Sequence, residues 1–163
     1  MVIVRVLKHL FTPHWLALRS FPHGTLAKIE QAVKRSERLH RGEIRFAIEA
    51  SLHLASLRLS TRQRARQVFA QLGVWDTAEN SGVLIYVQLI DRAIEIVADR
   101  GIAAKVQQSE WDAICRAMER AFKAGRFAEG SIEAIQAVTS ILARHFPGGG
   151  VNPNELPDKP VVL

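Results

Sequence analysis

The chain contains little cysteine and lacks any long uncharged apolar run. One cysteine among 163 residues excludes an intrachain disulfide and a Cys-x-x-Cys metal knuckle. No run of about 18 uncharged apolar residues occurs, which excludes a membrane-spanning helix. Aromatic residues make up 7% of the chain, and no aromatic RNA-binding motif is present. The 48% hydrophobic content suffices for one globular core.

Familiar catalytic fingerprints are also missing. The glycines form neither Gly-x-Gly-x-x-Gly nor the phosphate loop Gly-x-x-x-x-Gly-Lys. No His-Glu-x-x-His, Gly-x-Ser-x-Gly or protein-kinase signature occurs. A candidate site therefore has to come from residues that the fold brings together.

Positive charge is concentrated at the start of the chain. The net charge is +6, and residues 1–42 hold eight Lys or Arg and two acids, whereas residues 43–163 hold 14 of each. Such a run is typical of a solvated helix face, and it also suits an anionic partner. Apolar bulk alternates with cations over residues 2–11, as in interfacial segments, so we favour anionic lipid over nucleic acid. The candidate membrane-surface residues are Arg5, Lys8, Phe11, Trp15 and Arg19.

Composition divides the chain into three parts. Residues 1–22 form a basic apolar arm, residues 23–146 a domain, and residues 147–163 an extended, Pro-containing tail that we expect to be mobile. Alternatively, residues 161–163 dock as an added strand. The arm does not resemble a secretory signal, because cations interrupt its apolar stretch and no small-residue cleavage site follows. We expect a monomer, in the cytoplasm or peripheral at the inner membrane face.

The hydrophobic periodicity predicts an α/β fold. Period-3.6 patterns predict helices, and alternating or continuous apolar runs predict strands. The order is helix 25–41, strand 43–49, helix 60–72, strand 83–90, strand 93–98, helix 108–124 and helix 128–146, with residues 52–59 as a short helix or loop. Arg62, Arg64 and Arg66 are expected to face solvent. A strand-helix-strand crossover followed by a hairpin predicts an α/β/α sandwich with a small mixed sheet.

The hairpin predicts where oxygen ligands gather. A turn at residues 91–92 places residue 84 opposite residue 99, within two positions, and so brings segment 75–82 beside residues 99–101. The start of a parallel strand 43–49 lies at the same end. Oxygen donors that Ca²⁺ or Mg²⁺ would prefer then share this end: Glu43, Asp76, Glu79, Asn80 and Asp99. Alternatively, these side chains cap the loop, and Asp99 pairs with Arg100 or Arg45.

Several of these segments resemble a known family. Gly42-Glu43-Ile44, residues 65–69, residues 75–80, Gly82-Val83-Leu84-Ile85-Tyr86, residues 97–102 and residues 127–130 resemble the TPM domain family. The resemblance covers roughly residues 24–146. It implies an α/β/α sandwich, a divalent-cation site in the loops at one sheet end, and an acid phosphatase activity that is not general to the family. By position, loop 76–80, Glu43 and Asp99 are its candidate ligands.

Two main hypotheses about function follow. In the first, the chain is a TPM-like accessory module that associates peripherally with a membrane or with a protein partner. In the second, it is a phosphohydrolase in which Glu43, Asp76 and Asp99 hold the cation, Asn80 orients the phosphate and Arg100 balances its charge. A weaker third hypothesis is nucleic-acid binding through Lys34, Arg38 and Arg41, although no nucleic-acid partner is expected.

Overall fold

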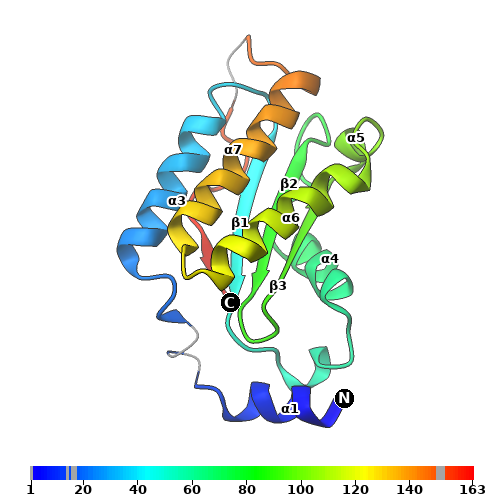
Figure 1. The fold of residues 1–163 in the computed structure, drawn as a ribbon. Helices are drawn as coiled ribbons and strands as arrows, with labels where there is room; N and C mark the ends of the chain where they lie inside the picture. The colour runs from blue at the N-terminus through cyan, green and yellow to red at the C-terminus, as the bar shows by residue number, and fades with distance from the viewer. Residues whose placement is uncertain (1, 14, 16–17, 150–152) are drawn as a thin grey trace.

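The computed structural model describes residues 2–13, 15, 18–149 and 153–163, with side chains from Val6 onward. A four-stranded mixed sheet in the order β3-β2-β1-β4 lies between helices on both faces (Figure 1). The strands are β1 (Glu43–Glu49), β2 (Gly82–Gln88), β3 (Ala93–Ala98) and β4 (Val161–Val162). The helices are α1 (Val2–Phe11), α3 (His23–Ser36), 3-10 helix η1 (Leu54–Ser56), α4 (Thr61–Gln71), α5 (Arg100–Ala103), α6 (Gln108–Lys123) and α7 (Phe127–His145). The α/β/α sandwich is confirmed.

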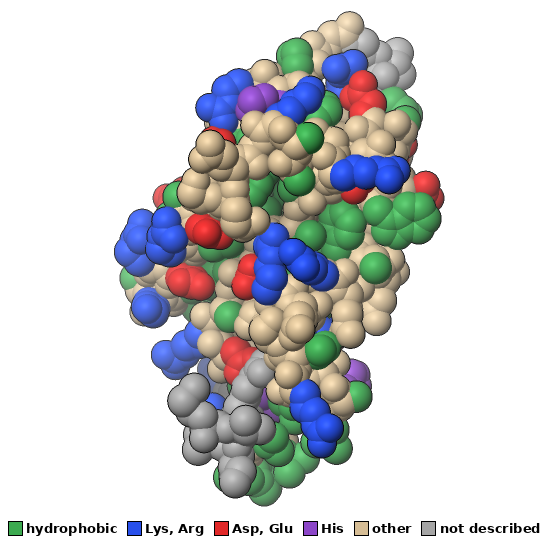
Figure 2. Space-filling model, turned by 90° about the vertical axis from the view of Figure 1, so that its right-hand side faces the viewer, with side chains coloured by type: hydrophobic (Ala, Val, Ile, Leu, Met, Phe, Trp, Pro, Cys, Tyr) green, Lys and Arg blue, Asp and Glu red, His purple; other side chains and the backbone are tan. Residues whose placement is uncertain are grey.

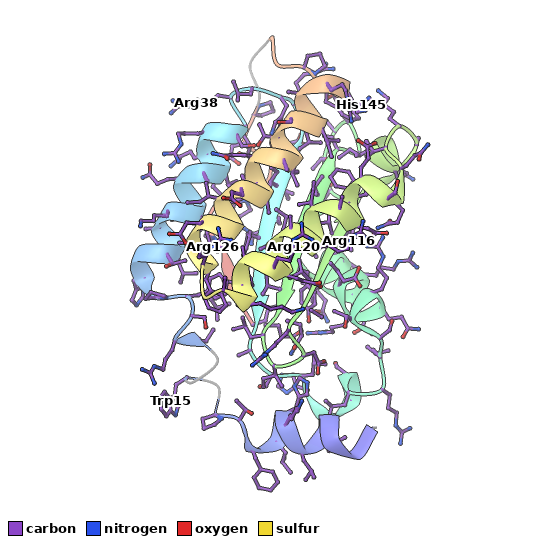
Figure 3. The ribbon with its side chains drawn as sticks, viewed as in Figure 1. Trp15, Arg38, Arg116, Arg120, Arg126 and His145 are labelled. Carbon is purple, nitrogen blue, oxygen red and sulfur yellow. The ribbon has the colours of Figure 1, made fainter. Side chains whose placement is uncertain are left out.

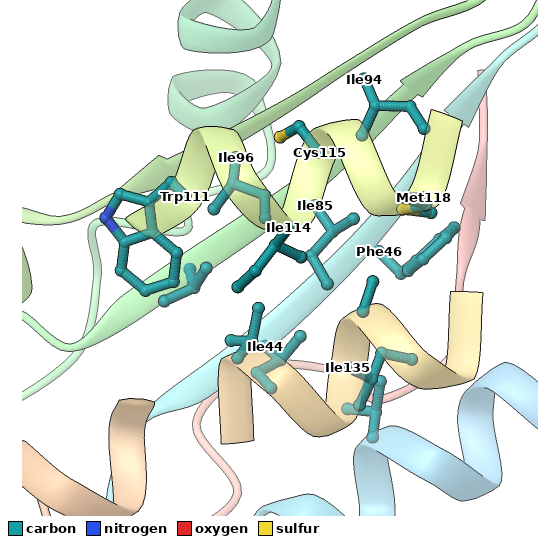
Figure 4. Close-up of a cluster of buried hydrophobic side chains, with 14 of the residues drawn as sticks. Ile44, Phe46, Ile85, Ile94, Ile96, Trp111, Ile114, Cys115, Met118 and Ile135 are labelled. Carbon is teal, nitrogen blue, oxygen red and sulfur yellow. The ribbon is translucent and has the colours of Figure 1, made fainter. Parts of the chain in front are cut away.

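The two inner strands, β1 and β2, are parallel and buried along their whole length. Both faces of β1 are covered, because every residue of the strand is buried. Helices α3, α6 and α7 cover one face of the sheet, and α4 covers the other (Figure 1). Ile44, Phe46 and Ile85 point toward α6 and α7 and pack with Trp111 and Ile135 (Figure 4). Burying each such side chain contributes about 1.5–3 kcal/mol, so this larger cluster dominates the core.

The β2–β3 turn is longer than the sequence predicts. Strand β2 ends at Gln88, which pairs with Ala93, and the backbone N–H of Arg92 donates to the Leu89 carbonyl oxygen at 3.1 Å. Arg92 takes the left-handed backbone conformation, with φ of 53°. The register therefore differs from the predicted one by two positions. An even shift leaves every side chain on its expected face, so the hairpin prediction holds at the level of the faces.

The C-terminal tail differs from the mobile segment that we expected. Val161 and Val162 pair in parallel with Ala47 and Ile48 of β1, as in the alternative of an added strand. Leu156 is buried against the face covered by α4. The tail packs because β1 would otherwise present an unpaired edge. The three residues 150–152 lie outside the described part of the chain.

The N-terminal arm contains helix α1, which lies across one end of the sheet (Figure 1). His9 fixes this helix to the domain. Its Nδ1 accepts a hydrogen bond from the Leu52 backbone N–H at 2.9 Å, and its Nε2 lies 3.2 Å from Asp91 Oδ1. Because both partners directly follow the carboxyl ends of β1 and β2, α1 lies at that end of the sheet.

Candidate functional site

The acidic residues predicted to share one end of the sheet do lie together, where β1 and β2 begin and β3 ends. We call this end of the sheet the acidic edge. Glu43 is the register partner of Gly82, and the backbone N–H of Asp99 donates to the Gly82 carbonyl oxygen at 2.9 Å. The N–H of Gly101 donates to the Asn80 carbonyl oxygen at 3.1 Å. Three segments that are distant in sequence therefore meet here, as the hairpin argument predicts.

The carboxylates at this edge do not converge on one point. Glu43 and Asp99 flank Gly82 on the same face of the sheet, and a Cβ on Gly82 would lie 1.9 Å from the Val74 carbonyl oxygen. The backbone of Val74 thus packs directly on Gly82, between the strand positions that carry Glu43 and Asp99. Asp76 is exposed in the following loop. Across the described ranges, no group of three or more His, Cys, Asp or Glu side chains could hold a metal ion.

The other predicted ligands contact protein groups. Asp99 Oδ1 accepts from the Arg100 backbone N–H at 2.7 Å and so caps α5, a short helix that the sequence reading missed. Glu79 pairs with Arg41 at 3.0 Å. Asn80 Oδ1 accepts from Arg100 Nε at 3.0 Å. These contacts resemble the alternative in which the acidic and amide side chains cap the loop instead of binding a metal ion. Asp99, however, accepts from the backbone N–H of Arg100 and does not pair with its guanidinium.

Two buried carboxyl groups lie where the tail crosses β1. Glu43 Oε2 accepts from the Leu156 backbone N–H at 3.1 Å, whereas Glu43 Oε1 is buried without a hydrogen-bond partner. Burial raises the pKa of Glu43 to about 7. Burial, together with the charge of Glu43, raises the pKa of Glu37 to about 9, and the Ile44 backbone N–H donates to Glu37 Oε1 at 3.1 Å. Near neutral pH Glu37 is therefore protonated and Glu43 is about half protonated, which limits repulsion from Asp158 of the tail.

A Ser–His pair in the structure is sealed from solvent. His40 is fully buried, and its Nδ1 accepts from the Gly42 backbone N–H at 3.2 Å. The ring proton therefore lies on Nε2, which donates to Ser36 Oγ at 2.8 Å. Burial lowers the pKa of His40 to about 4. A serine next to a histidine has the chemistry of a hydrolase nucleophile, but this pair has no access to a substrate and serves as a core contact.

The expectation that Arg64 faces solvent is wrong. Arg64 is buried and donates from Nη2 to Glu49 Oε1 at 2.7 Å, and the Tyr86 hydroxyl donates to the same carboxylate. Arg64 lies next to Ala65 on the buried face of α4, so its side chain points toward the sheet. There its positive charge neutralises Glu49 of β1. This cluster joins α4 to β1 and β2, and it has no open face for a ligand.

Helix α1 presents an apolar face to solvent. Three large apolar side chains form this face: Leu7, Leu10 and Phe11. Together with the neighbouring Trp15, which follows the helix, they are 46–74% exposed. Hydrophobic side chains gather at the lower end of the molecule in Figure 2, where α1 lies. Trp15 projects outward at the same end in Figure 3. The spacing of three and four residues places these side chains on the side of α1 opposite to the buried His9.

Cations lie beside this apolar face. Lys8 of α1 is exposed, and so is Arg19 farther along the arm. Arg5 belongs to α1, but its side chain lies outside the described residues. Phe11 and Trp15, the apolar members of the predicted set, are among the most exposed large side chains. Lys8 and Phe11 of α1 and the neighbouring Trp15 thus lie at one end of the molecule, and their role at a membrane surface stays a prediction.

A groove of about 750 Å³ opens between α1, the β2–β3 turn, the end of α6 and the start of α7. We call it the hairpin groove. Its lining includes the cations Lys8, Arg92 and Lys123 and the rings of Phe122 and Phe127. It lies at the opposite end of β2 from the acidic edge, because it contains the residues that follow Gln88.

The comparisons identify the family. A family model described as the TPM domain matches residues 20–141, about three quarters of the chain. The chain belongs to the TPM domain family. No curated protein matches it. The resemblance expected from the sequence is therefore confirmed.

Solved structures share this TPM fold. BA42 from the psychrophilic bacterium Bizionia argentinensis is 30% identical, with a TM-score of 0.77, over 87% of this chain and 94% of that one. The N-terminal domain of a P. gingivalis protein is 17% identical, with a TM-score of 0.64, over 80% and 83% of the two chains. The N-terminal domain of cg2496 from Corynebacterium glutamicum is 12% identical, with a TM-score of 0.58, over 83% and 82%. The last two likenesses show the fold alone.

Besides α5, two surface features of this TPM domain were not predicted from the sequence. Leu7 and Leu10 belong to the exposed face, and their spacing of three and four residues with Phe11 was the available signal. The hairpin groove had no such signal, because it depends on how α1 and α6 approach the turn. Among the described residues, no helix has both the length and the apolar character needed to cross a bilayer.

Proposed function

We propose that this TPM domain is an accessory module that attaches peripherally to anionic membranes through α1. The observation that carries the proposal is the exposed apolar face of α1, formed by Leu7, Leu10, Phe11 and the neighbouring Trp15. An amphipathic helix with such a face lies in the membrane interface, with its apolar side toward the acyl chains.

Charge supports the same orientation. The N-terminal 42 residues carry the whole net charge of +6. Each Lys or Arg near an anionic lipid surface contributes about 1 kcal/mol of attraction. Lys8 is exposed on α1 beside the apolar face, whereas Arg38 and Arg41 of the same basic stretch lie at the opposite end of the molecule. The described cation that α1 itself brings to the inserting end is therefore Lys8.

Co-sedimentation with vesicles tests the proposal. The full chain is mixed with vesicles of phosphatidylglycerol and phosphatidylcholine, and the Leu10→Ser/Phe11→Ser variant is compared with Leu39→Ser. Leu39 is as exposed as Leu10, at 61% and 62%, but lies at the other end of the molecule beside Arg38 (Figure 3). Burying a Leu or Phe contributes about 1.5–3 kcal/mol, so we expect the double variant to bind at least tenfold more weakly.

Leu39→Ser should partition like the unmodified chain. Equal partitioning of the double variant and the unmodified chain would contradict the proposal. Binding to pure phosphatidylcholine as strong as to the anionic mixture would contradict its electrostatic part.

The phosphohydrolase alternative has weaker support. Arg100 and Asn80 are exposed or half-buried at the acidic edge and could approach a phosphate. However, the carbonyl of Val74 packs on Gly82, between the strand positions of Glu43 and Asp99, and Asp99 caps α5. A metal-dependent reaction needs ligands that converge on the ion, and the membrane proposal does not depend on that convergence.

A further inference from the structure

The hairpin groove gathers cations from three separate elements. Lys8 comes from α1, Arg92 from the β2–β3 turn and Lys123 from the end of α6. None of the three forms an ion pair within the part of the chain that the structure describes. Two acids, Asp91 and Glu119, also line the groove, and Asp91 contacts His9. Three cations against two acids leave a net charge of +1 in the lining. The groove is therefore positively charged overall.

The groove also has an apolar wall. Ile94, Phe122 and Phe127 line it, and the two phenylalanine ring centroids lie 4.8 Å apart. Its volume of about 750 Å³ falls within the range of about 300–1,000 Å³ that is typical of small-molecule sites. Apolar concave walls focus the field of nearby charges, so an anion is attracted more strongly here than on an open surface.

We propose that the hairpin groove binds the phosphate headgroup of an anionic phospholipid, with the adjoining part of its acyl chains on Phe122 and Phe127. Lys and Arg are the side chains that bind phosphate oxygens most strongly, and a phosphomonoester carries enough charge for three cations. The inference rests on the proposed function in one respect: α1 both lines the groove through Lys8 and presents the apolar face to the membrane.

An NMR titration of the full chain tests this site. The probe is dihexanoyl phosphatidic acid below its micelle concentration. We expect saturable shifts of the backbone amides of residues 88–94 and 122–127. Dihexanoyl phosphatidylcholine has the same chains without net charge, and inorganic phosphate has the charge without chains. Each should bind at least tenfold more weakly.

These two probes also separate the sources of the ligand chemistry. Phosphatidylcholine binding as tight as phosphatidic acid would overturn the role of the cations. Inorganic phosphate binding as tight as phosphatidic acid would overturn the lipid assignment and indicate a site for free phosphate.

Matched variants locate the site. Lys123→Gln and Arg92→Gln should each weaken the binding of dihexanoyl phosphatidic acid at least fivefold. Arg120→Gln removes the same charge from exposed α6 (Figure 3) without lining the groove, and it should stay within twofold. Glu119→Gln should tighten binding at least twofold, because it removes an anion from the lining. Equal losses in Arg120→Gln and Lys123→Gln would overturn the proposal.

Failure of this inference differs from failure of the proposed function. If the short-chain phosphatidic acid does not bind but vesicles sediment the chain through α1, the groove proposal is wrong and the membrane proposal stands. If it binds with the expected variant pattern but vesicles do not sediment the chain, the groove proposal stands and the membrane proposal is wrong.

Discussion

His40 makes the stability of this TPM domain sensitive to acid. The pKa of His40 is lowered from 6.5 to about 4 by burial, so the unfolded chain takes up a proton between these values that the folded chain refuses. Its contribution to stability is complete above pH 6.5 and falls as the pH drops toward 4. Between pH 7 and pH 5 the expected loss is about 2 kcal/mol. Urea unfolding of the unmodified chain and of His40→Gln at both pH values measures it.

The comparison with His40→Gln is needed because Glu37 acts in the opposite direction. The pKa of Glu37 is raised to about 9, so its contribution is complete below pH 4.5 and is lost as the pH rises toward 9. The unmodified chain and His40→Gln both contain Glu37, so the difference between their pH-dependent free energies of unfolding reports the contribution of His40. Parallel pH profiles for the two proteins would show that His40 is not held neutral.

At the residue scale, the positions of the candidate ligands were predictable but their contacts were not. Glu43 and Asp99 lie beside Gly82 as strand order and hairpin register predict. What separates them is the backbone of Val74, which fits over Gly82 because that residue has no Cβ. Gly82 is visible in the sequence. The close contact of Val74 with it depends on the path of the chain after α4, which the sequence does not reveal.

At the element scale, the tail behaves as part of the domain, and Leu156 is its main apolar contact. Leu156 is 7% exposed and packs on the same cluster as Leu84 and Tyr86. We expect Leu156→Ala to destabilise the domain by about 2–5 kcal/mol, the usual cost of removing a buried leucine side chain. Val162→Ala serves as the control, because Val162 is half-exposed in the edge strand and should cost less than about 1 kcal/mol.

Two measurements separate loss of the tail from loss of the fold. Urea unfolding gives the global change, and hydrogen exchange of the Leu163 amide reports docking, since this N–H donates to the Ile48 carbonyl oxygen at 2.8 Å. Faster exchange in Leu156→Ala with unchanged global stability would show that the tail detaches alone. Unchanged exchange and stability would contradict the packing role of Leu156.

Hydrophobic periodicity predicted the helices and strands that bury a continuous apolar face. It was less informative for short segments such as the C-terminal tail. Helices α6 and α7 and strands β1 and β2 have long apolar patterns that left few alternatives. The tail has prolines and few apolar residues, so its composition suggested mobility. Its place is decided by the unpaired edge of β1, which is a property of the assembled sheet.

At the scale of the whole molecule, the two ends of the sheet differ in chemistry. The acidic edge, with Asp76 and Asp99, lies where β2 begins, and α1 and the hairpin groove lie where β2 ends. Seven residues of extended strand separate them, a span of about 20 Å. A membrane bound through α1 would therefore leave the acidic edge facing away from the bilayer.

The three tryptophans can report this orientation. Trp15 is 65% exposed at the α1 end, Trp75 is 55% exposed at the acidic edge, and Trp111 is buried in the core. Quenchers attached to acyl chains act only over short distances, so we expect brominated phosphatidylglycerol vesicles to quench the fluorescence of Trp75→Phe, which retains Trp15. The Trp15→Phe variant retains Trp75 and should show almost no quenching while it still sediments with the vesicles. Comparable quenching in both variants, or quenching of Trp15→Phe alone, would place a different surface against the lipid and exclude α1 as the contact.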